Sequence, residues 1–197
     1  MDKKLQADLV HSKTGCVVWL TGLSGAGKSS IANELKRAMS TLGEPACVLD
    51  GDKVRCGLCS DLAFSPQDRK ENVRRISEVA KLFAEAGNIC IVALISPYRN
   101  DRLEARNILT TGRFIEVYVN APIEICEQRD PKGLYAKARA GEIKEFTGVS
   151  APYEAPGKPE IELHTDKLTI AESVNKILDY LKMSWSGDGD ECHRMLK

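Results

Sequence analysis

The stretch GLSGAGKS, from Gly22 to Ser29, places glycines, a lysine and a serine at the spacing of a phosphate-binding loop. Glycines let backbone N–H groups turn inward toward an anion, and a helix that starts at the loop adds partial positive charge. In such loops the lysine reaches the β- and γ-phosphates of a nucleoside triphosphate, and the serine hydroxyl binds Mg²⁺. The pattern therefore predicts a nucleotide and Mg²⁺ site, with Lys28 as a catalytic residue and Ser29 as a metal ligand. The residues expected to bind the nucleotide in this loop are Gly22, Leu23, Ser24, Gly25, Ala26, Gly27, Lys28, Ser29 and Ser30.

The segments on either side of the loop support this prediction. The apolar, β-rich run CVVWLTG precedes the loop, and Ile31, Leu35 and Met39 follow it at helical spacing. A strand before the loop and a helix after it are the context in which this motif binds phosphate. A glycine-rich turn that binds nothing is therefore the weaker interpretation.

Strand-like and helix-like segments alternate along the rest of the chain. Strands are expected in ACVLDGD, NICIVALIS, FIEVYVNA and IELHT, and helices near residues 28–43, 68–87, 100–109, 122–129 and 170–182. Strands that alternate with helices form a parallel sheet covered on both faces. The expected fold class is therefore α/β, a P-loop NTPase fold with three α/β/α layers, a central parallel sheet and a mobile lid.

The domain organisation follows from length and composition. A chain of 197 residues suffices for one full core, and no linker divides it, so residues 1–183 are expected to form one domain. The basic segment at about 129–159 has the cations and glycine hinges of a lid that closes over phosphates, although a solvated surface loop is the alternative. Residues 184–197 are rich in glycine and aspartate, and we expect a disordered tail.

Charge and hydropathy exclude several classes of protein. Lys and Arg together number 28, as do Asp and Glu, and this balance argues against a nucleic-acid or membrane-surface binder. No apolar run approaches the roughly 20 residues of a membrane span, and the N-terminus has no secretory h-region. Several of the seven cysteines lie in apolar runs, as small hydrophobic residues do. We expect a cytoplasmic protein, or a plastid protein if a transit peptide has been removed.

The size and the basic lid favour a small-molecule kinase among P-loop proteins. The guanine-reading NKxD motif of a GTPase is absent, and a motor ATPase needs a longer chain. The segments WLTGLSGAGKS, LDGDKVR, FSPQDRKENVRRISEVAKLFAEAG, ISPYR and CEQRDPKGLYAKARAGEIKEFTGVSAPYEAP closely resemble adenylylsulfate kinases. The resemblance covers about residues 15–182. It implies transfer of the γ-phosphate of ATP, with Mg²⁺, to the 3′-hydroxyl of adenosine 5′-phosphosulfate (APS), giving 3′-phosphoadenosine 5′-phosphosulfate (PAPS). It also implies a homodimer.

Two aspartates and two arginines near the loop have chemistry that suits this reaction. Asp50 and Asp52 end a strand beside the phosphate loop, where a carboxylate can orient the acceptor hydroxyl or hold Mg²⁺. An Asp-Gly-Asp turn is the alternative. By resemblance Asp50 is catalytic and a metal ligand.

The resemblance implies substrate binding by Asp52, Arg55, Arg69, Asn72 and Lys132, and ATP contact by Arg129. Guanidinium groups match the oxygens of a phosphosulfate. Arg74 and Arg75 have no such support and are compatible with exposed helix cations.

Two aromatic residues and one strand end complete the expected substrate site. By resemblance Phe64 and Phe146 stack on the two faces of the APS adenine, and their polar surroundings in the sequence favour exposed rings. Ile95 and Ser96 end a strand at the ligand edge of the sheet. The family pattern marks Ser96 as a catalytic phosphoserine. Because no base for it is evident, hydrogen bonding to substrate is the preferred interpretation.

Other functions stay open at this point. A nucleoside-monophosphate or sugar-acid kinase, or a P-loop regulator without turnover, would use the same loop. Cys56 and Cys59 form a Cys-x-x-Cys pair that could belong to a zinc or thiol protein, yet zinc needs four ligands and only Cys192 and His193 remain as further candidates.

Overall fold

A five-stranded parallel sheet forms the centre of the molecule. The structure is a computed structural model that describes residues 15–109 and 112–186. The strands follow the order β2-β3-β1-β4-β5, and each adjacent pair is parallel. Their bounds are β1 Cys16–Thr21, β2 Ala46–Asp50, β3 Ile89–Ala93, β4 Phe114–Asn120 and β5 Ile161–His164. The α/β class expected from alternating strands and helices is confirmed.

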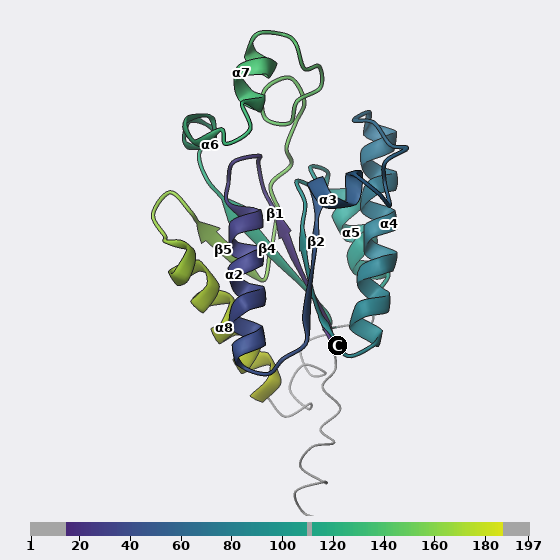
Figure 1. Ribbon diagram of the computed structural model, residues 1–197, viewed down its shortest axis with the longest axis vertical. Coiled ribbons are helices and arrows are strands. Elements are labelled where there is room, and N and C mark those ends of the chain that lie inside the picture. The colour runs from purple at the N-terminus through teal and green to yellow at the C-terminus, as the bar shows by residue number, and fades with distance from the viewer. Residues whose placement is uncertain (1–14, 110–111, 187–197) are drawn as a thin grey trace, which may run out of the picture.

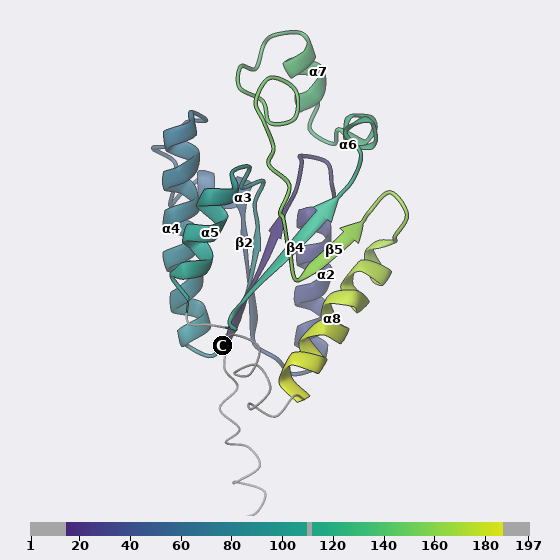
Figure 2. The ribbon, with the colours of Figure 1, turned by 180° about the vertical axis from the view of Figure 1, so that it is seen from behind.

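Helices cover both faces of this sheet. Their bounds are α2 Lys28–Thr41, α3 Gly51–Arg55, α4 Pro66–Glu85, α5 Arg99–Asn107, α6 Ile123–Arg129, α7 Leu134–Arg139 and α8 Ile170–Ser186. Figures 1 and 2 show α2 and α8 on one face, α4 and α5 on the other, and α6 and α7 beyond one end of the strands. These are the three expected layers. Among the described residues no helix is both long and apolar enough to cross a membrane.

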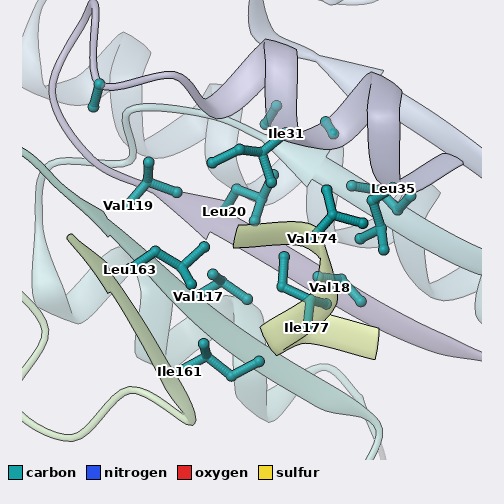
Figure 3. Packing of buried hydrophobic residues seen from close by; sticks show 14 of the residues in the cluster. Val18, Leu20, Ile31, Leu35, Val117, Val119, Ile161, Leu163, Val174 and Ile177 are labelled. Carbon is teal, nitrogen blue, oxygen red and sulfur yellow. The ribbon is translucent and has the colours of Figure 1, made fainter. Parts of the chain in front are cut away.

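Successive side chains of β1 supply two separate hydrophobic clusters. Val18 and Leu20 pack toward α2 and α8, whereas Val17 and Trp19 pack toward α4 and α5. This follows from the two-residue period of a strand, which sends neighbouring side chains to opposite faces. Figure 3 shows the first cluster, in which Ile177 of α8 lies close to the sheet. Because both faces are covered, β1 and β3 are buried along their whole length.

Two short helices depart from the expected elements. The DGD segment does not simply end a strand: Asp50 is the N-cap of α3, and its Oδ1 accepts a hydrogen bond from the Asp52 amide at 3.0 Å. The second short helix, α7, lies inside the segment expected to be a loop-rich lid. The last helix, α8, continues to Ser186 rather than ending before residue 184, and the remainder of the expected disordered tail lies outside the described residues.

Candidate active site

A cavity of about 1180 Å³ lies at the carboxyl ends of the strands. Ligands of open parallel sheets bind at this edge. Gly22 and Leu23 do not line the cavity, but all other predicted site residues do. Those residues are Ser24, Gly25, Ala26, Gly27, Lys28, Ser29, Ser30, Asp50, Asp52, Arg55, Phe64, Arg69, Asn72, Ile95, Ser96, Arg129, Lys132 and Phe146. The fold therefore brings together residues that lie more than a hundred positions apart in the chain.

The phosphate loop holds its lysine by the loop's own backbone. Lys28 Nζ donates hydrogen bonds to the carbonyl oxygens of Gly22 at 2.9 Å and Leu23 at 2.6 Å, so these two residues hold the Lys28 side chain although they do not line the cavity. Gly25 has φ 76°, and a Cβ there would lie 2.7 Å from the carbonyl oxygen of Cys126, so glycine is required. Burial lowers the pKa of the Lys28 ammonium to about 8. An anion bound in the loop would stabilise the charged form.

A hydroxyl and a carboxylate meet at the start of α2. Ser29 Oγ donates to Asp50 Oδ2 at 2.6 Å, and Asp50 is buried. Both groups are hard oxygen donors, the type that Mg²⁺ binds in phosphoryl-transfer sites. The residues present therefore fit the Mg²⁺ ion that the sequence predicts.

Two guanidinium groups and an aromatic ring form the opposite side of the cavity. The Arg55 guanidinium carbon lies 4.4 Å from the centroid of the Phe64 ring, and that of Arg69 lies 5.7 Å from it. Arg69 also donates to the carbonyl oxygens of Phe64 at 2.9 Å and Glu145 at 2.8 Å. Phe64 is 55% exposed, as expected for a ligand-facing ring. Stacked cations beside an exposed ring suit a planar anionic ligand.

The expectation of an exposed Phe146 is wrong. This ring is only 8% exposed and packs edge-on against Tyr135 of α7, with centroids 5.0 Å apart. The polar sequence around Phe146 gave no sign of α7, which supplies the covering residue. Phe146 still lines the cavity, but no aromatic contact joins it to Phe64 within residues 15–109 and 112–186.

Two buried polar atoms beside the cavity have no hydrogen-bond partner among the described residues. Asn72 Oδ1 and Thr147 Oγ1 belong to side chains that are 6% and 2% exposed, respectively. An unpaired buried polar group costs roughly 1–3 kcal/mol, so such atoms are natural contacts for a bound polar ligand. Asn72 was expected here from the family resemblance, whereas Thr147 was missed.

The Ser96 hydroxyl faces the protein interior. Its oxygen accepts from Trp19 Nε1 at 3.1 Å, and the hydroxyl donates to Thr21 Oγ1 at 3.0 Å. The Thr21 hydroxyl also contacts the Tyr153 hydroxyl at 3.0 Å. Ser96 has φ 39°, an unusual backbone conformation that turns the chain at the end of β3. These partners join the sheet to the segment that returns from the lid.

The cations expected in the lid make two separate contacts. Lys132 forms an ion pair with Asp52 at the start of α3. Arg129 donates to the carbonyl oxygen of Thr165 at 2.6 Å and to that of Gly25 at 3.4 Å. Arg129 and Lys132 thereby connect the segment that follows α6 to both the α3 side and the phosphate-loop side of the cavity.

The segment after β5 also lines the cavity, and the sequence prediction missed it. Thr165 Oγ1 donates to the carbonyl oxygen of Ala26 at 2.8 Å, and the cavity continues along the start of α8. The lining residues there are Thr165, Leu168, Thr169, Ile170 and Ser173. The position of Thr165 at the end of a parallel strand was the signal that could have identified it.

The cysteine pair shows no metal chemistry in the described part of the chain. Cys56 is exposed and Cys59 is buried, and both are free thiols. No group of three or more His, Cys, Asp or Glu side chains in residues 15–109 and 112–186 is arranged to hold a metal ion. Cys192 and His193 lie outside those residues.

The comparison with protein families decides the assignment. The family described as adenylylsulphate kinase matches residues 14–164. The chain belongs to the adenylylsulphate kinase family. An adenylyl-sulfate kinase of Staphylococcus haemolyticus is 60% identical over 166 residues, which cover 84% of this chain and 83% of that protein.

Solved structures agree with this family. The Mycobacterium tuberculosis APS kinase CysC, solved with AMPPNP and APS, is 47% identical, with a TM-score of 0.83 over 86% of this chain and 98% of that one. A hexameric APS kinase from Thiobacillus denitrificans is 34% identical, with a TM-score of 0.66 over 92% of this chain and 31% of that one. The fold and the family thus come from independent comparisons of sequence and structure.

Proposed function

We propose that this chain transfers the γ-phosphoryl group of ATP to the 3′-hydroxyl of adenosine 5′-phosphosulfate, giving PAPS. The observation that carries the proposal is a single cavity with a phosphate loop on one side and the Arg55–Phe64 stack on the other, in a chain of the adenylylsulphate kinase family. The CysC structure, which holds both AMPPNP and APS, supports two nucleotide subsites in one protein of this fold.

ATP is proposed to bind along the phosphate loop, with its γ-phosphoryl group at Lys28. Loop N–H groups and the start of α2 stabilise the phosphate charge, and Arg129 joins the loop to Thr165 beside it. Mg²⁺ held by Ser29 and Asp50 would neutralise developing charge on the transferred group. Binding at this end orients the γ-phosphoryl group toward the centre of the cavity.

APS is proposed to occupy the opposite side, where Arg55, Arg69 and Lys132 meet its phosphosulfate. The exposed Phe64 ring offers a face for the adenine, and Phe146 contributes from the lid. Asn72 and the Asp52 carboxylate are the remaining polar side chains at this side of the cavity, and Ile95 at the strand end also lines it. In this arrangement the 3′-hydroxyl points at the γ-phosphoryl group, as an in-line transfer requires.

Asp50 is the proposed group that orients or deprotonates the 3′-hydroxyl. It is a buried carboxylate at the cavity wall, and its Oδ1 is held by the Asp52 amide. The Ser96 hydroxyl, in contrast, is bonded to Trp19 and Thr21 and has, among the described residues, no carboxylate or imidazole partner that could take its proton. We therefore assign Ser96 the role of shaping the cavity, and a phosphoserine intermediate is not part of the mechanism.

The function is tested by measuring ADP release with APS, AMP and gluconate as separate acceptors. The proposal predicts that ADP is released when APS is the acceptor and not when AMP or gluconate is. ADP release with AMP or gluconate but not with APS would assign another kinase activity to this chain. No release with any acceptor would favour a nucleotide-binding regulator. Lys28→Ala should lower APS-dependent turnover by about 10³-fold, because removal of one strong transition-state contact costs this much.

Assembly into a homodimer is the remaining part of the proposal. It is supported by the resemblance to the family, and the Thiobacillus denitrificans relative is itself a hexamer. Sedimentation velocity of the purified chain, whose mass is 21.7 kDa, should give a species of twice that mass. A single 21.7 kDa species at all concentrations would remove the dimer from the account.

A further inference from the structure

A turn without regular strand or helix structure orients one of the two arginines at the substrate side. Residues 56–62 connect α3 to the segment that carries Phe64. Arg55 Nη1 donates to the carbonyl oxygens of Leu62 at 3.1 Å and Ala63 at 2.8 Å. The orientation of the Arg55 guanidinium over the Phe64 ring therefore depends on where this turn lies.

Arg75 of α4 makes four hydrogen bonds, and three of them hold the turn in place. Its Nη1 and Nη2 donate to the two carboxylate oxygens of Asp61 at 2.6 Å and 2.8 Å, and Nη1 also donates to the carbonyl oxygen of Leu58 at 3.1 Å. The fourth bond, from Nε to Glu71 Oε1 at 2.9 Å, fixes the arginine on its own helix. A planar guanidinium with five donors suits this bidentate geometry, and an ammonium does not. The interpretation of Arg75 as a plain exposed cation is therefore wrong.

Arg74 provides a direct contrast on the same helix. Its Nε and Nη2 donate to Glu71 at 2.7 Å and 2.9 Å, and these are its hydrogen bonds within the described residues. The Arg74 side chain is 53% exposed, whereas that of Arg75 is 27% exposed. Both arginines thus share one acidic partner, but Arg75 also reaches the turn.

The same helix presents substrate-side residues to the cavity. Arg69, near the start of α4, donates to the carbonyl oxygen of Phe64 and lines the cavity. The turn and the Phe64 segment are therefore tied to α4 at two places, by Arg75 at Leu58 and Asp61 and by Arg69 at Phe64. Because α4 is a rigid element of 20 residues packed on the sheet, these ties give the Arg55–Phe64 stack a fixed place.

We propose that Arg75 and Asp61 are positioning residues that set the affinity for APS by holding Arg55 and Phe64 in their binding geometry. This inference rests on the proposed function, since it assigns Arg55 and Phe64 to the APS side. Neither Arg75 nor Asp61 lines the cavity, so both act through other residues. Small displacements of binding groups have large kinetic effects, which gives a distant clamp a measurable role.

The test compares steady-state kinetics of Arg75→Ala, Arg74→Ala and the wild-type chain, with APS and ATP varied in turn. Arg75→Ala should raise KM for APS by about tenfold while KM for ATP and kcat stay within about twofold. Arg74→Ala should match the wild type in all three constants. A general loss of structure would change both KM values and kcat, so the selective change separates positioning from mere stability.

A second variant keeps the test decisive if Arg75→Ala folds poorly. Asp61→Asn preserves the shape of the side chain but weakens its pairing with Arg75, and it should raise KM for APS in the same selective way. The double variant Asp61→Asn with Arg75→Ala should be no worse than Arg75→Ala alone, because both remove one interaction.

The outcomes distinguish this inference from the proposed function. If Arg75→Ala and Asp61→Asn both match Arg74→Ala in KM for APS, the clamp is overturned although the enzyme is an APS kinase. Equal increases in KM for ATP and APS would also overturn it. If the wild type and Arg74→Ala show no APS-dependent ADP release, the proposed function itself fails.

Discussion

Lys28 is a cation held inside the protein by carbonyl oxygens rather than by a carboxylate. Its hydrogen bonds to Gly22 and Leu23 hold the ammonium in position when no nucleotide is bound. Burial nevertheless makes the charged form of this side chain less favourable. A triphosphate supplies the missing negative charge. Nucleotide binding and the protonation of this side chain should therefore be coupled.

The coupling predicts proton uptake when ATP binds near pH 8. With a pKa of about 8, roughly half of the Lys28 side chains are neutral at that pH, and the bound phosphates favour the charged form. The affinity for ATP should accordingly fall as the pH rises through 8.

Calorimetric titrations in two buffers of different ionisation enthalpy measure the proton uptake. Lys28→Arg is the control, because arginine stays protonated and should show none. Equal uptake by both proteins would assign the proton to another group.

Ser96→Ala tests whether this serine carries a phosphoryl group. Loss of its hydroxyl leaves Trp19 Nε1 without an acceptor, which should lower the free energy of unfolding by about 1–3 kcal/mol. Turnover should stay within about tenfold of the wild type, since a positioning contact and not a covalent step is lost. The comparison is Ser77→Ala, which removes a buried hydroxyl that donates to the Val73 carbonyl oxygen; Ser77 itself does not line the cavity. Abolished turnover in a stable Ser96→Ala protein, or a phosphorylated chain by intact mass, would restore the phosphoserine.

The segment expected to form a lid contains the helix α7 as well as loops, and one aspartate accepts hydrogen bonds from the start of that helix. Asp130 Oδ1 accepts from the Leu134 amide at 2.8 Å, and Oδ2 accepts from the amides of Tyr135 at 3.0 Å and Ala136 at 3.2 Å. These are N–H groups of the first turn of α7, which have no partner within the helix. A helix of six residues has little stability of its own, so this cap decides whether it forms.

Asp130→Ala should loosen α7 without unfolding the domain. Loss of a helix cap costs about 1 kcal/mol, so amide exchange in residues 134–139 should speed up by roughly fivefold. Hydrogen exchange followed by mass spectrometry measures this segment directly. Glu142→Ala, which removes an exposed acid elsewhere in the lid, is the matched control and should leave exchange unchanged. Identical exchange in both variants would show that α7 does not depend on this cap.

The long elements of this fold could be predicted from the sequence, and the short ones could not. The helices α2, α4 and α8 have apolar stripes over several turns, which periodicity detects. By contrast α3 and α7 are five and six residues long; Asp50 caps α3, and the Asp130 carboxylate accepts from the first amides of α7. The glycine-rich turn between β1 and α2 was predicted because its residues are contiguous in the sequence. The burial of Phe146 was not, because Tyr135 covers it from a helix that periodicity does not reveal.

At the scale of the whole molecule, two hydrophobic clusters hold the sheet between its helical layers. The larger one joins β5 and α8 to the centre of the sheet, and Leu163 in it is fully buried. The strand ends at which the cavity opens are therefore held by this cluster, whose members Leu163 and Ile177 do not line the cavity. Stability and substrate binding should consequently respond to different substitutions.

Leu163→Ala should destabilise the fold while leaving the site chemistry in place. Truncation of a buried leucine typically lowers the free energy of unfolding by about 2–5 kcal/mol. Leu82→Ala provides the control, since Leu82 is 65% exposed and its loss should change the free energy by less than about 0.5 kcal/mol. Urea unfolding of both variants, with kinetic constants for the folded protein, measures the difference. Equal destabilisation would show that the packing around β5 is not a principal source of stability.

The central claim is that one cavity joins ATP to APS so that the 3′-hydroxyl receives the γ-phosphoryl group. Phosphorus NMR of the purified chain with ATP, Mg²⁺ and APS observes the bond that forms. The account predicts a new 3′-phosphomonoester on a nucleotide whose 5′-phosphosulfate is intact, together with one ADP for each product molecule. A phosphoryl group at any other position, or ATP that stays unconsumed while APS is present, would contradict it.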